Sequence, residues 1–272
     1  MPLNSRQDAR AEPKIRPCAL ISGASAGIGA ELARAFAAKG HDLVLVARSR
    51  DKLGAIAREL EGEHSARVRI IPADLSVPGV PQTLCDRLSE KGIDIDVLVN
   101  NAGVLFEGDF ANVALDDHLR LLQINIVALT ALTRLLLPAM LERRSGRILN
   151  VASTAAFMPI PRLATYAAAK SYLLSLTEAL SEELRGTGVT VTALCPGFTQ
   201  TSMLSGSRLA RWVPSMLVMS ASAVAQEGCD ACLAGETIHV AGIGNDVAAR
   251  GVGFLPRLLV RAVGGLVTSR GA

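Results

Sequence analysis

Short apolar runs alternate with amphipathic stretches along most of the chain, which predicts a parallel β-sheet covered by helices. The runs expected to form strands are Cys18–Ser22, Asp42–Ala47, Arg67–Pro72, Asp96–Asn100, Gly146–Ser153, Val189–Cys195 and Glu236–Ala241. The stretches with helical character are Glu31–Lys39, Asp51–Glu61, Gln82–Lys91, Leu115–Met140, Ala164–Leu184 and Ala223–Leu233. We therefore expect one α/β domain with a doubly wound parallel sheet of about seven strands and helices on both faces. In such sheets, ligands bind at the carboxyl ends of the strands.

Composition agrees with this architecture. Half of the 272 residues are apolar but only 3% are aromatic, so Ala, Val, Leu and Ile must build the core. Aliphatic residues of this kind suit strands that are buried on both faces. The net charge is only +3 and no basic run stands out, so nucleic-acid binding is not indicated.

The two ends of the chain differ from the middle. Residues 1–16 are polar and interrupted by prolines, which predicts a flexible tail, and residues 17–242 are expected to form the folded domain. Residues 243–272 are expected to form a helical extension. Its basic amphipathic stretch Leu255–Val263 could pack on its own domain, on a partner subunit or on a membrane surface.

Targeting signals and cysteine usage favour a cytoplasmic protein. No secretory apolar region follows Met1, and no apolar stretch reaches about 18 uncharged residues. The five cysteines are an odd number and scattered, which fits a reducing compartment better than a disulfide framework. Cys229 and Cys232 form a Cys-x-x-Cys, which we interpret as two core residues on one helix face, and no metal site is expected.

A glycine-rich turn follows the first expected strand and opens the first helix. In Gly23-Ala-Ser25-Ala-Gly27-Ile28-Gly29, Gly23 permits a tight turn, Gly27 allows close approach to a pyrophosphate, and Gly29 allows close helix packing. The helix N-terminus then offers N–H groups and a positive dipole end to phosphates. The loop therefore predicts dinucleotide binding.

The next two strands end in polar residues that indicate which dinucleotide binds. Arg48 follows the second strand, where an acidic residue would bind ribose hydroxyls and repel a 2′-phosphate. The guanidinium of Arg48 can instead pair with that phosphate, although a solvated surface arginine is the alternative. Asp74 and Leu75 follow the third strand, and the carboxylate could accept from the adenine amino group. The pattern predicts NADP(H).

Tyr166 and Lys170 lie four apart on an expected helix, so their side chains share one face. A free phenol titrates near ~10, and a neighbouring cation is expected to lower its pKa towards the working pH of an acid–base catalyst. Ser153 ends the fifth apolar run. Asn125 lies inside an apolar helix, where it is either part of a structural network or functional. The irregular stretch Met203–Met219 could be a substrate lid or a packed core segment.

Taken together, these motifs resemble those of a classical short-chain dehydrogenase/reductase. Ser22–Gly29 is similar to the Thr-Gly-x-x-x-Gly-x-Gly loop of the family, and Asn100-Asn-Ala-Gly103, Ser153, Tyr166-x-x-x-Lys170 and Pro196-Gly197 follow in the family order. The resemblance covers roughly residues 17–242 and implies a Rossmann-type fold. It implies a catalytic tetrad of Asn125, Ser153, Tyr166 and Lys170. The implied cofactor-binding residues are Gly23, Ser25, Gly27, Ile28, Arg48, Asp74, Leu75, Asn101, Gly103, Tyr166, Lys170, Pro196, Gly197, Thr199 and Thr201.

The resemblance also implies a mechanism in which hydride passes between the nicotinamide and a carbonyl carbon. Ser153 would hold the carbonyl oxygen, Tyr166 would exchange the proton, Lys170 would lower the pKa of the tyrosine, and Asn125 would hold a water. NADP-preferring relatives often carry a basic residue before the middle glycine of the loop, where this chain has Ala26.

We therefore expect an NADP(H)-dependent carbonyl reductase or secondary-alcohol dehydrogenase. NAD-dependent oxidation on the same fold and a non-catalytic dinucleotide sensor or scaffold are the alternatives. Family habit implies a homo-dimer or homo-tetramer. Four large apolar residues suggest an apolar substrate: Phe157, Met158, Leu204 and Trp212.

Overall fold

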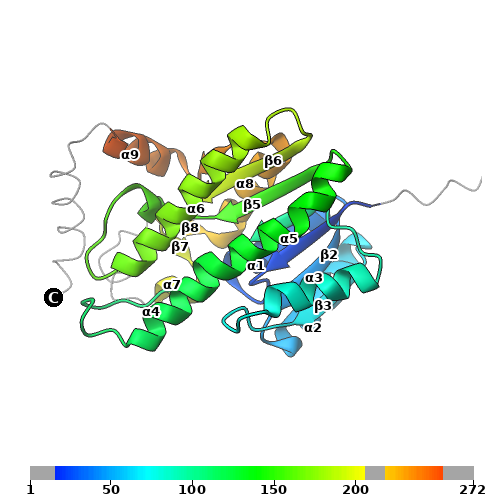
Figure 1. Cartoon of the computed structure of the whole chain (residues 1–272), viewed down its shortest axis with the longest axis horizontal. Helices are drawn as coiled ribbons and strands as arrows, with labels where there is room; N and C mark the ends of the chain where they lie inside the picture. The colour runs from blue at the N-terminus through cyan, green and yellow to red at the C-terminus, as the bar shows by residue number, and fades with distance from the viewer. Residues whose placement is uncertain (1–15, 206–217, 254–272) are drawn as a thin grey trace, which may run out of the picture.

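The computed structural model describes residues 16–205 and 218–253, and its centre is a seven-stranded parallel sheet (Figure 1). The strand order is β3-β2-β1-β4-β5-β6-β9, and every neighbouring pair runs parallel. The strands are β1 (Cys18–Ser22), β2 (Asp42–Ala47), β3 (Val68–Pro72), β4 (Val97–Asn100), β5 (Gly146–Val151), β6 (Val189–Cys195) and β9 (Ile238–Val240). The order reverses beside β1, which is where an open parallel sheet forms its ligand crevice. The predicted doubly wound, Rossmann-type fold is confirmed.

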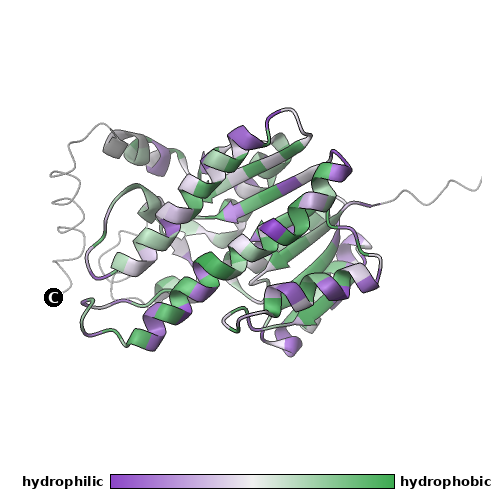
Figure 2. Cartoon of the chain, viewed as in Figure 1, coloured by the Kyte–Doolittle hydropathy of each residue, from purple (hydrophilic) through white to green (hydrophobic). Residues whose placement is uncertain are grey.

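Helices cover both faces of this sheet. The helices of eight or more residues are α1 (Gly27–Ala38), α2 (Arg50–His64), α3 (Val80–Glu90), α4 (Leu115–Leu122), α5 (Leu129–Glu142), α6 (Ala164–Glu183), α8 (Ala221–Ala234) and α9 (Ile243–Gly253). The aliphatic faces of α1, α2 and α8 meet one side of the sheet in a single buried cluster. Those of α3 and α5 fill the other side together with α6. Figure 2 shows the resulting pattern of apolar strands and amphipathic helices.

Several boundaries differ from the sequence expectations for local reasons. The fifth strand ends at Val151, because Ser153 begins the 3₁₀ turn Thr154–Phe157 (η2). The pair β7 (Thr199–Gln200) and β8 (Met219–Ser220) was not expected, and the short helix α7 (Ser202–Ser205) follows β7. The predicted tail 1–15, most of the segment 203–219 with Trp212, and the stretch Leu255–Val263 lie outside the described residues.

The predicted helix Leu115–Met140 is continuous but not regular. Between α4 and α5 the segment Gln123–Ala128 (η1) is a π-helix, which is a wider turn often found at functional sites. Within the described ranges, Leu115–Glu142 is the one helix long and apolar enough to cross a membrane, judged by length and composition only. The expectation that no stretch reaches about 18 uncharged residues still holds for this helix, because Arg120 and Arg134 interrupt it. Thr133 on this helix accepts a hydrogen bond from Asn100 inside the domain, and Leu132 and Met140 are buried.

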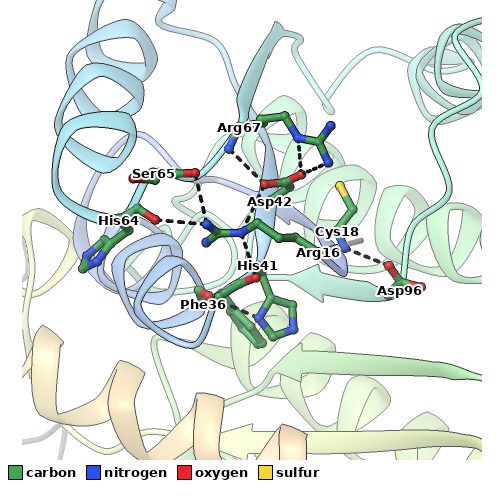
Figure 3. Close-up of polar contacts among 10 residues, drawn as sticks. Arg16, Cys18, Phe36, His41, Asp42, His64, Ser65, Arg67 and Asp96 are labelled. Atoms are coloured by element: carbon green, nitrogen blue, oxygen red, sulfur yellow. Dashed lines mark hydrogen bonds and ion pairs between the residues drawn. The ribbon is translucent and has the colours of Figure 1, made fainter. Parts of the chain in front are cut away.

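A polar cluster fixes the edge of the sheet opposite the ligand crevice (Figure 3). Arg16 donates to the carbonyls of His64 (3.1 Å) and Ser65 (3.0 Å) at the end of α2. The buried Asp42 at the start of β2 lies between Arg16 (3.5 Å) and Arg67 (2.6 Å). A buried carboxylate such as Asp42 is stable only when it is paired, so it keeps its contacts with Arg16 and Arg67. Because Arg16 also binds the carbonyls at the end of α2, the cluster holds that helix at a fixed position along the sheet. The other end of α2 therefore reaches the crevice in a defined position.

The Cys-x-x-Cys lies where the sequence predicted. Cys229 and Cys232 are buried on α8 in the cluster shared with α1 and β1. Burial raises the pKa of both thiols to about 12, which suits core residues and not thiolate ligands. In the described part of the chain, no group of His, Cys, Asp or Glu could hold a metal ion.

Candidate active site

A cavity of about 790 Å³ opens at the carboxyl ends of the central strands. It is lined by the loops after β1, β2, β3, β4, β5 and β6, so segments far apart in the sequence meet there. All predicted cofactor-binding residues line it: Gly23, Ser25, Gly27, Ile28, Arg48, Asp74, Leu75, Asn101, Gly103, Tyr166, Lys170, Pro196, Gly197, Thr199 and Thr201. Ser153 lines it as well, whereas Asn125 is buried behind the wall. Volumes of this size accommodate cofactors and drug-sized ligands.

The glycine loop needs its glycines for two separate reasons. Gly23 and Gly27 have φ values of +68° and +55°, in the left-handed region that side chains rarely adopt. Gly29 has ordinary angles, but a Cβ atom there would collide with the amide of Asn101 and the carbonyl of Gly23. Helix α1 begins at Gly27 without a side-chain cap, because Ala26 has no acceptor. Its first N–H groups therefore face the cavity, as a phosphate site requires.

Asn101 holds this loop in place from the neighbouring strand end. Its Nδ2 donates to the carbonyls of Ser22 (2.9 Å) and Gly23 (3.3 Å). The Ser22 hydroxyl in turn accepts from the backbone N–H groups of Asn101 and Ala102, each at 3.0 Å. The resemblance implied that Asn101 belongs to the cofactor-binding residues. Its amide hydrogens are directed at the loop, so it acts on the cofactor site by shaping the glycine turn.

The end of β2 carries a second cation that the sequence analysis missed. Arg48 and Lys52 both line the cavity and both are exposed. Lys52 lies in the first turn of α2, whose N-terminus is capped by Ser49 at 3.4 Å. The position of Lys52 could have indicated this role, because the first turn of a helix that directly follows a strand lies beside the crevice. In the sequence, however, Lys52 looks like any solvated helix lysine.

Asp74 at the end of β3 is a carboxylate already engaged on one side. Its Oδ1 accepts from the backbone N–H (2.9 Å) and the hydroxyl (2.7 Å) of Ser76. Burial raises the pKa of Asp74, but the Ser76 hydrogen bonds and the charge of Arg48 outweigh it and hold the pKa below its ordinary value. The carboxylate is therefore charged and held at the cavity wall, as expected for an acceptor of the adenine amino group.

Ser153, Tyr166 and Lys170 converge on the far half of the cavity. The Ser153 hydroxyl accepts from Ala155 N–H (3.1 Å), lies 3.4 Å from the Pro196 carbonyl, and is hydrogen-bonded to the Tyr166 phenol. The Lys170 Nζ lies 5.6 Å from the centre of the Tyr166 ring and donates to the Val151 carbonyl at 2.8 Å. The structure thus brings the three predicted side chains together on η2 and one face of α6.

The acid–base properties of this trio differ from the sequence expectation. Burial raises the pKa of Tyr166 above its ordinary value, and the hydrogen bond with Ser153 opposes only part of the rise. Burial also lowers the pKa of Lys170 to about 8. The predicted lowering of the tyrosine pKa by Lys170 is therefore wrong for this arrangement, because desolvation dominates and the opposing effect comes from Ser153. Tyr166 is a protonated acid at neutral pH.

Asn125 serves the site through the backbone of the loop after β4. Its side chain accepts from Val104 N–H (2.9 Å) and donates to the Val104 carbonyl (3.1 Å). A Cβ atom on Gly103 would lie 3.5 Å from Asn125 Oδ1 and 3.7 Å from Lys170 Nζ. Asn125 and Lys170 therefore flank the same glycine. The helix is locally π-helical at Asn125, and the residue pattern did not predict this distortion.

A buried hydrogen-bond relay connects the helices that carry these residues. The Thr177 hydroxyl donates its one proton to the Leu173 carbonyl (2.8 Å), so it must accept from Asn150 Nδ2 (2.8 Å). Asn150 Oδ1 then accepts from Asn100 Nδ2 (2.9 Å), which also donates to Thr133 (2.9 Å). The relay runs from α6 through β5 and β4 to α5 and fixes their separation.

The loop after β6 closes the cavity against the glycine loop. A Cβ atom on Gly27 would lie 3.1 Å from the Thr201 methyl, so these two loops are in contact. The Thr199 hydroxyl donates to the Gly197 carbonyl at 3.1 Å. Gly197 has no room for a side chain, because Asn245 from α9 packs against its Cα. The helix after β9 thus supports the Pro196-Gly197 turn from behind.

Fold and site together define a nicotinamide-dependent oxidoreductase of the α/β class. The family model of short chain dehydrogenases matches residues 17–212, and the chain belongs to that family.

Relatives and solved structures agree with this assignment. The chain is 37% identical to the ketoacyl reductase HetN of a Nostoc species over 191 residues, covering 70% of this chain and 66% of that protein. It is 31% identical to the very-long-chain 3-oxoacyl-CoA reductase of Rattus norvegicus over 247 residues, covering 89% and 78%. A short-chain dehydrogenase from Sphingobium yanoikuyae, solved in complex with NADPH, superimposes with a TM-score of 0.75 at 31% identity, covering 89% and 97%.

Proposed function

We propose that this protein is an NADP(H)-dependent reductase of a carbonyl group on an apolar small molecule, with Tyr166 as the proton donor. The observation that carries the proposal is one continuous cavity wall, with the glycine loop and two cations at one end and the Ser153–Tyr166–Lys170 trio at the other. Two of the relatives are named as reductases of ketoacyl or 3-oxoacyl substrates, which supports the reductive direction.

The residues present fit a nicotinamide dinucleotide. The turn is tight because Gly23 and Gly29 lack Cβ atoms, which would clash with Asn101, and the uncapped start of α1 presents N–H groups. When bound, the cofactor supplies the hydride that reduces the carbonyl carbon. The Ser153 hydroxyl can turn from the long 3.4 Å contact with Pro196 and donate to the carbonyl oxygen as negative charge develops on it.

Tyr166 then completes the reduction by protonating that oxygen. Its raised pKa keeps the phenol protonated at neutral pH, which suits an acid more than a base. Lys170 can return a proton to the phenolate, since its own pKa of about 8 lies close to the working pH. Asn125 holds the loop at Val104, so Gly103 stays beside Lys170.

The preference for NADP(H) rests on Arg48 and Lys52. No carboxylate follows β2, and both cations line the part of the cavity beside Ser49 and the start of α2. Charge-assisted hydrogen bonds to a phosphate contribute about 1.5–3 kcal/mol each, so Arg48→Ala should lower the NADPH-over-NADH ratio of kcat/KM by roughly 10- to 100-fold. Lys52→Ala should have a smaller effect in the same direction.

Arg50→Ala is the matched control, because Arg50 lies in the same turn but does not line the cavity. Equal use of NADH and NADPH by the unmodified protein would favour the NAD-dependent alternative.

The proposed apolar substrate is supported by one of the predicted residues, Leu204, and by three that were not predicted. Leu204 lines the cavity, as do Leu105, Ile160 and Leu163. Phe157 and Met158 do not line it, since Phe157 packs on the buried cluster beneath η2, and Trp212 lies outside the described residues. The substrate half of the site is therefore aliphatic in character.

The test is NADPH oxidation measured across a panel of ketones and aldehydes. Tyr166→Phe should reduce kcat by about 10²- to 10⁴-fold while leaving NADPH affinity within a few-fold. Tyr172→Phe is the control on the same helix, since its hydroxyl bonds to Thr130 (3.0 Å) at an exposed position. A Tyr166→Phe variant that keeps substantial turnover would rule out Tyr166 as the proton donor. Tight NADPH binding without turnover on any carbonyl would favour the sensor or scaffold alternative.

A further inference from the structure

The Pro196-Gly197 turn in the cavity wall is supported from outside the cavity by the first turn of α9. Asn245 fills the space behind Gly197, since a Cβ atom on that glycine would lie 2.6 Å from Asn245 Nδ2. The amide of Asn245 is itself held, because Nδ2 donates to the Ala241 carbonyl at 2.8 Å. Asn245 does not line the cavity, so it can affect a bound cofactor only through this turn.

The chain direction at Gly242 decides where α9 begins and therefore where Asn245 lies. Gly242 has a φ of +82°, a conformation that glycine adopts readily, and a Cβ atom there would lie 2.7 Å from Met219 Sδ. Its carbonyl accepts from the N–H groups of Asn245 (3.0 Å) and Asp246 (3.1 Å). Its own N–H donates to Glu227 Oε2 at 3.0 Å. Glu227 belongs to α8, so a side chain from another helix fixes the turn that opens α9.

Glu227 also binds His239, whose imidazole lies between two carboxylates. His239 Nε2 lies 3.1 Å from Glu227 Oε2, and His239 Nδ1 lies 2.9 Å from Glu236 Oε2. An ionised carboxylate only accepts hydrogen bonds, so both ring nitrogens must carry a proton to make these two contacts. The geometry therefore requires His239 to be an imidazolium. If it lost one proton, a nitrogen lone pair would face one of the carboxylates and repel it.

The electrostatics of this cluster agree with its geometry. Burial lowers the pKa of His239, but the hydrogen bonds and charges of Glu236 and Glu227 outweigh burial and raise the pKa above 6.5. Asp230 on α8 and Asp246 on α9, the other acidic residues of the helices beside β9, are not among the causes of this shift. The doubly donating form of His239 is therefore complete below pH 6.5 and is lost as the pH rises through the raised pKa.

We propose that Glu227 and His239 are positioning residues for the cofactor, because they hold the Gly242 turn and, through Asn245, the Pro196-Gly197 turn of the cavity wall. Neither residue lines the cavity, so each acts on it only through these turns. The inference rests on the proposed binding of NADP(H) and adds a pH dependence that is set outside the cavity. Binding is strongest while His239 is an imidazolium and weakens when the second proton is lost.

The experiment measures the Kd for NADPH, by the fluorescence of the bound cofactor, from about pH 6 to pH 9 for the wild type and for His239→Gln. Glutamine does not titrate in this range and can donate to a carboxylate only from its single amide nitrogen. The ratio of the two Kd values cancels the titration of Lys170, which both proteins share. We expect the variant to bind about 3- to 10-fold more weakly at pH 6, and the ratio to fall towards one as the pH rises.

Substitutions of Glu227 separate positioning from a general loss of structure. Glu227→Ala leaves the Gly242 N–H without its acceptor and should raise the Kd and KM for NADPH by about 3- to 10-fold at pH 7. The kcat at saturating NADPH should stay within about twofold, whereas partial unfolding would lower kcat and leave KM unchanged. Glu227→Gln keeps an acceptor oxygen and should recover most of the lost affinity.

Asp230→Asn is the matched control, because Asp230 lies one turn away on α8 and pairs with Lys39 at 2.6 Å instead of the Gly242 turn. It should bind NADPH as the wild type does at every pH. Melting temperatures show whether each variant is folded. If Glu227→Ala does not fold, the pH dependence of the His239→Gln ratio decides the question.

The outcomes distinguish this inference from the proposed function. Tight NADPH binding by the wild type together with a Kd ratio that does not change with pH overturns the positioning role and leaves the reductase proposal intact. A folded Glu227→Ala variant with the wild-type Kd does the same. A wild type that binds neither NADPH nor NADH at any pH overturns the proposed function and this inference with it.

Discussion

Replacing Lys170 with methionine should make this protein more stable at neutral pH. Lys170 is only 5% exposed, and burial lowers its pKa from 10.5 to about 8. The difference, 10.5 − 8, is about 2.5 pKa units, and at 1.36 kcal/mol per unit it corresponds to roughly 3 kcal/mol of unfavourable charging in the folded state. Methionine has a similar length, keeps most of the packing and removes the charge. It also loses the hydrogen bond to Val151, which is worth about 1 kcal/mol.

The effect has a defined pH window. Below about pH 8 the lysine is protonated in both states, so the full cost of the buried charge is present. Between about 8 and 10.5 the unfolded chain holds a proton that the folded chain has released, so the stability of the wild type rises with pH. The advantage of Lys170→Met, about 2 kcal/mol or 4–8 °C in Tm at pH 7, should therefore close by pH 10.5.

Urea or thermal unfolding of both proteins from pH 7 to 10.5 measures this difference. Lys39→Met is the matched control: Lys39 is exposed, its pKa is raised by Asp230, and its removal should not stabilise the protein. A Lys170→Met variant that is less stable than the wild type at pH 7, or an advantage that does not change with pH, would refute the reasoning. The variant should be catalytically impaired in either case, which would make Lys170 a site where function is kept at a cost in stability.

Two further substitutions test how the site is built. Gly29→Ala should lower the free energy of unfolding by about 1–3 kcal/mol and abolish tight NADPH binding, because its methyl group meets backbone and amide atoms. Gly54→Ala, in an open position on α2, should instead raise stability by roughly 0.5–1 kcal/mol, and equal effects on unfolding in urea would contradict the steric argument. Thr133→Val keeps the shape but leaves an amide hydrogen of Asn100 without its acceptor, so denaturant unfolding should show a loss of about 1–3 kcal/mol. An unchanged midpoint would mean that the relay is not needed to hold α5.

Much of the fold followed from the sequence because buried parallel strands leave a strong local trace. Runs such as Leu43–Val46 and Val191–Cys195 are buried on both faces, and the residues Arg48 and Pro196 that follow these strands line the cavity. The glycine loop and the Tyr166–Lys170 pair were also predictable, since backbone conformation and helical spacing are local properties. Their meeting in one cavity followed from the rule that parallel strands end at one edge.

The missing parts depend on three-dimensional surroundings that spacing does not encode. Lys52 belongs to the site only because α2 begins at the crevice, and Glu227 contacts the Gly242 turn only because α8 lies beside the end of β9. The pKa of Tyr166 was predicted in the wrong direction because sequence spacing reveals a neighbouring cation but not the depth of burial. Phe157 was assigned to the substrate pocket because an apolar residue reads the same whether it faces a ligand or the core.

The π-helical turn at Gln123–Ala128 holds one residue more than a regular helix would, and it joins α4 to α5. Deleting a single residue from that turn would make α4 and α5 one regular α-helix. Leu115–Leu122 would then be rotated about the helix axis relative to α5. Asp117, which lines the cavity beside the loop after β4, would move with α4, whereas Thr133 would keep its hydrogen bond to Asn100 in the sheet. Changes of length at this joint are thus a means by which evolution or an engineer could reshape substrate entry without disturbing the sheet.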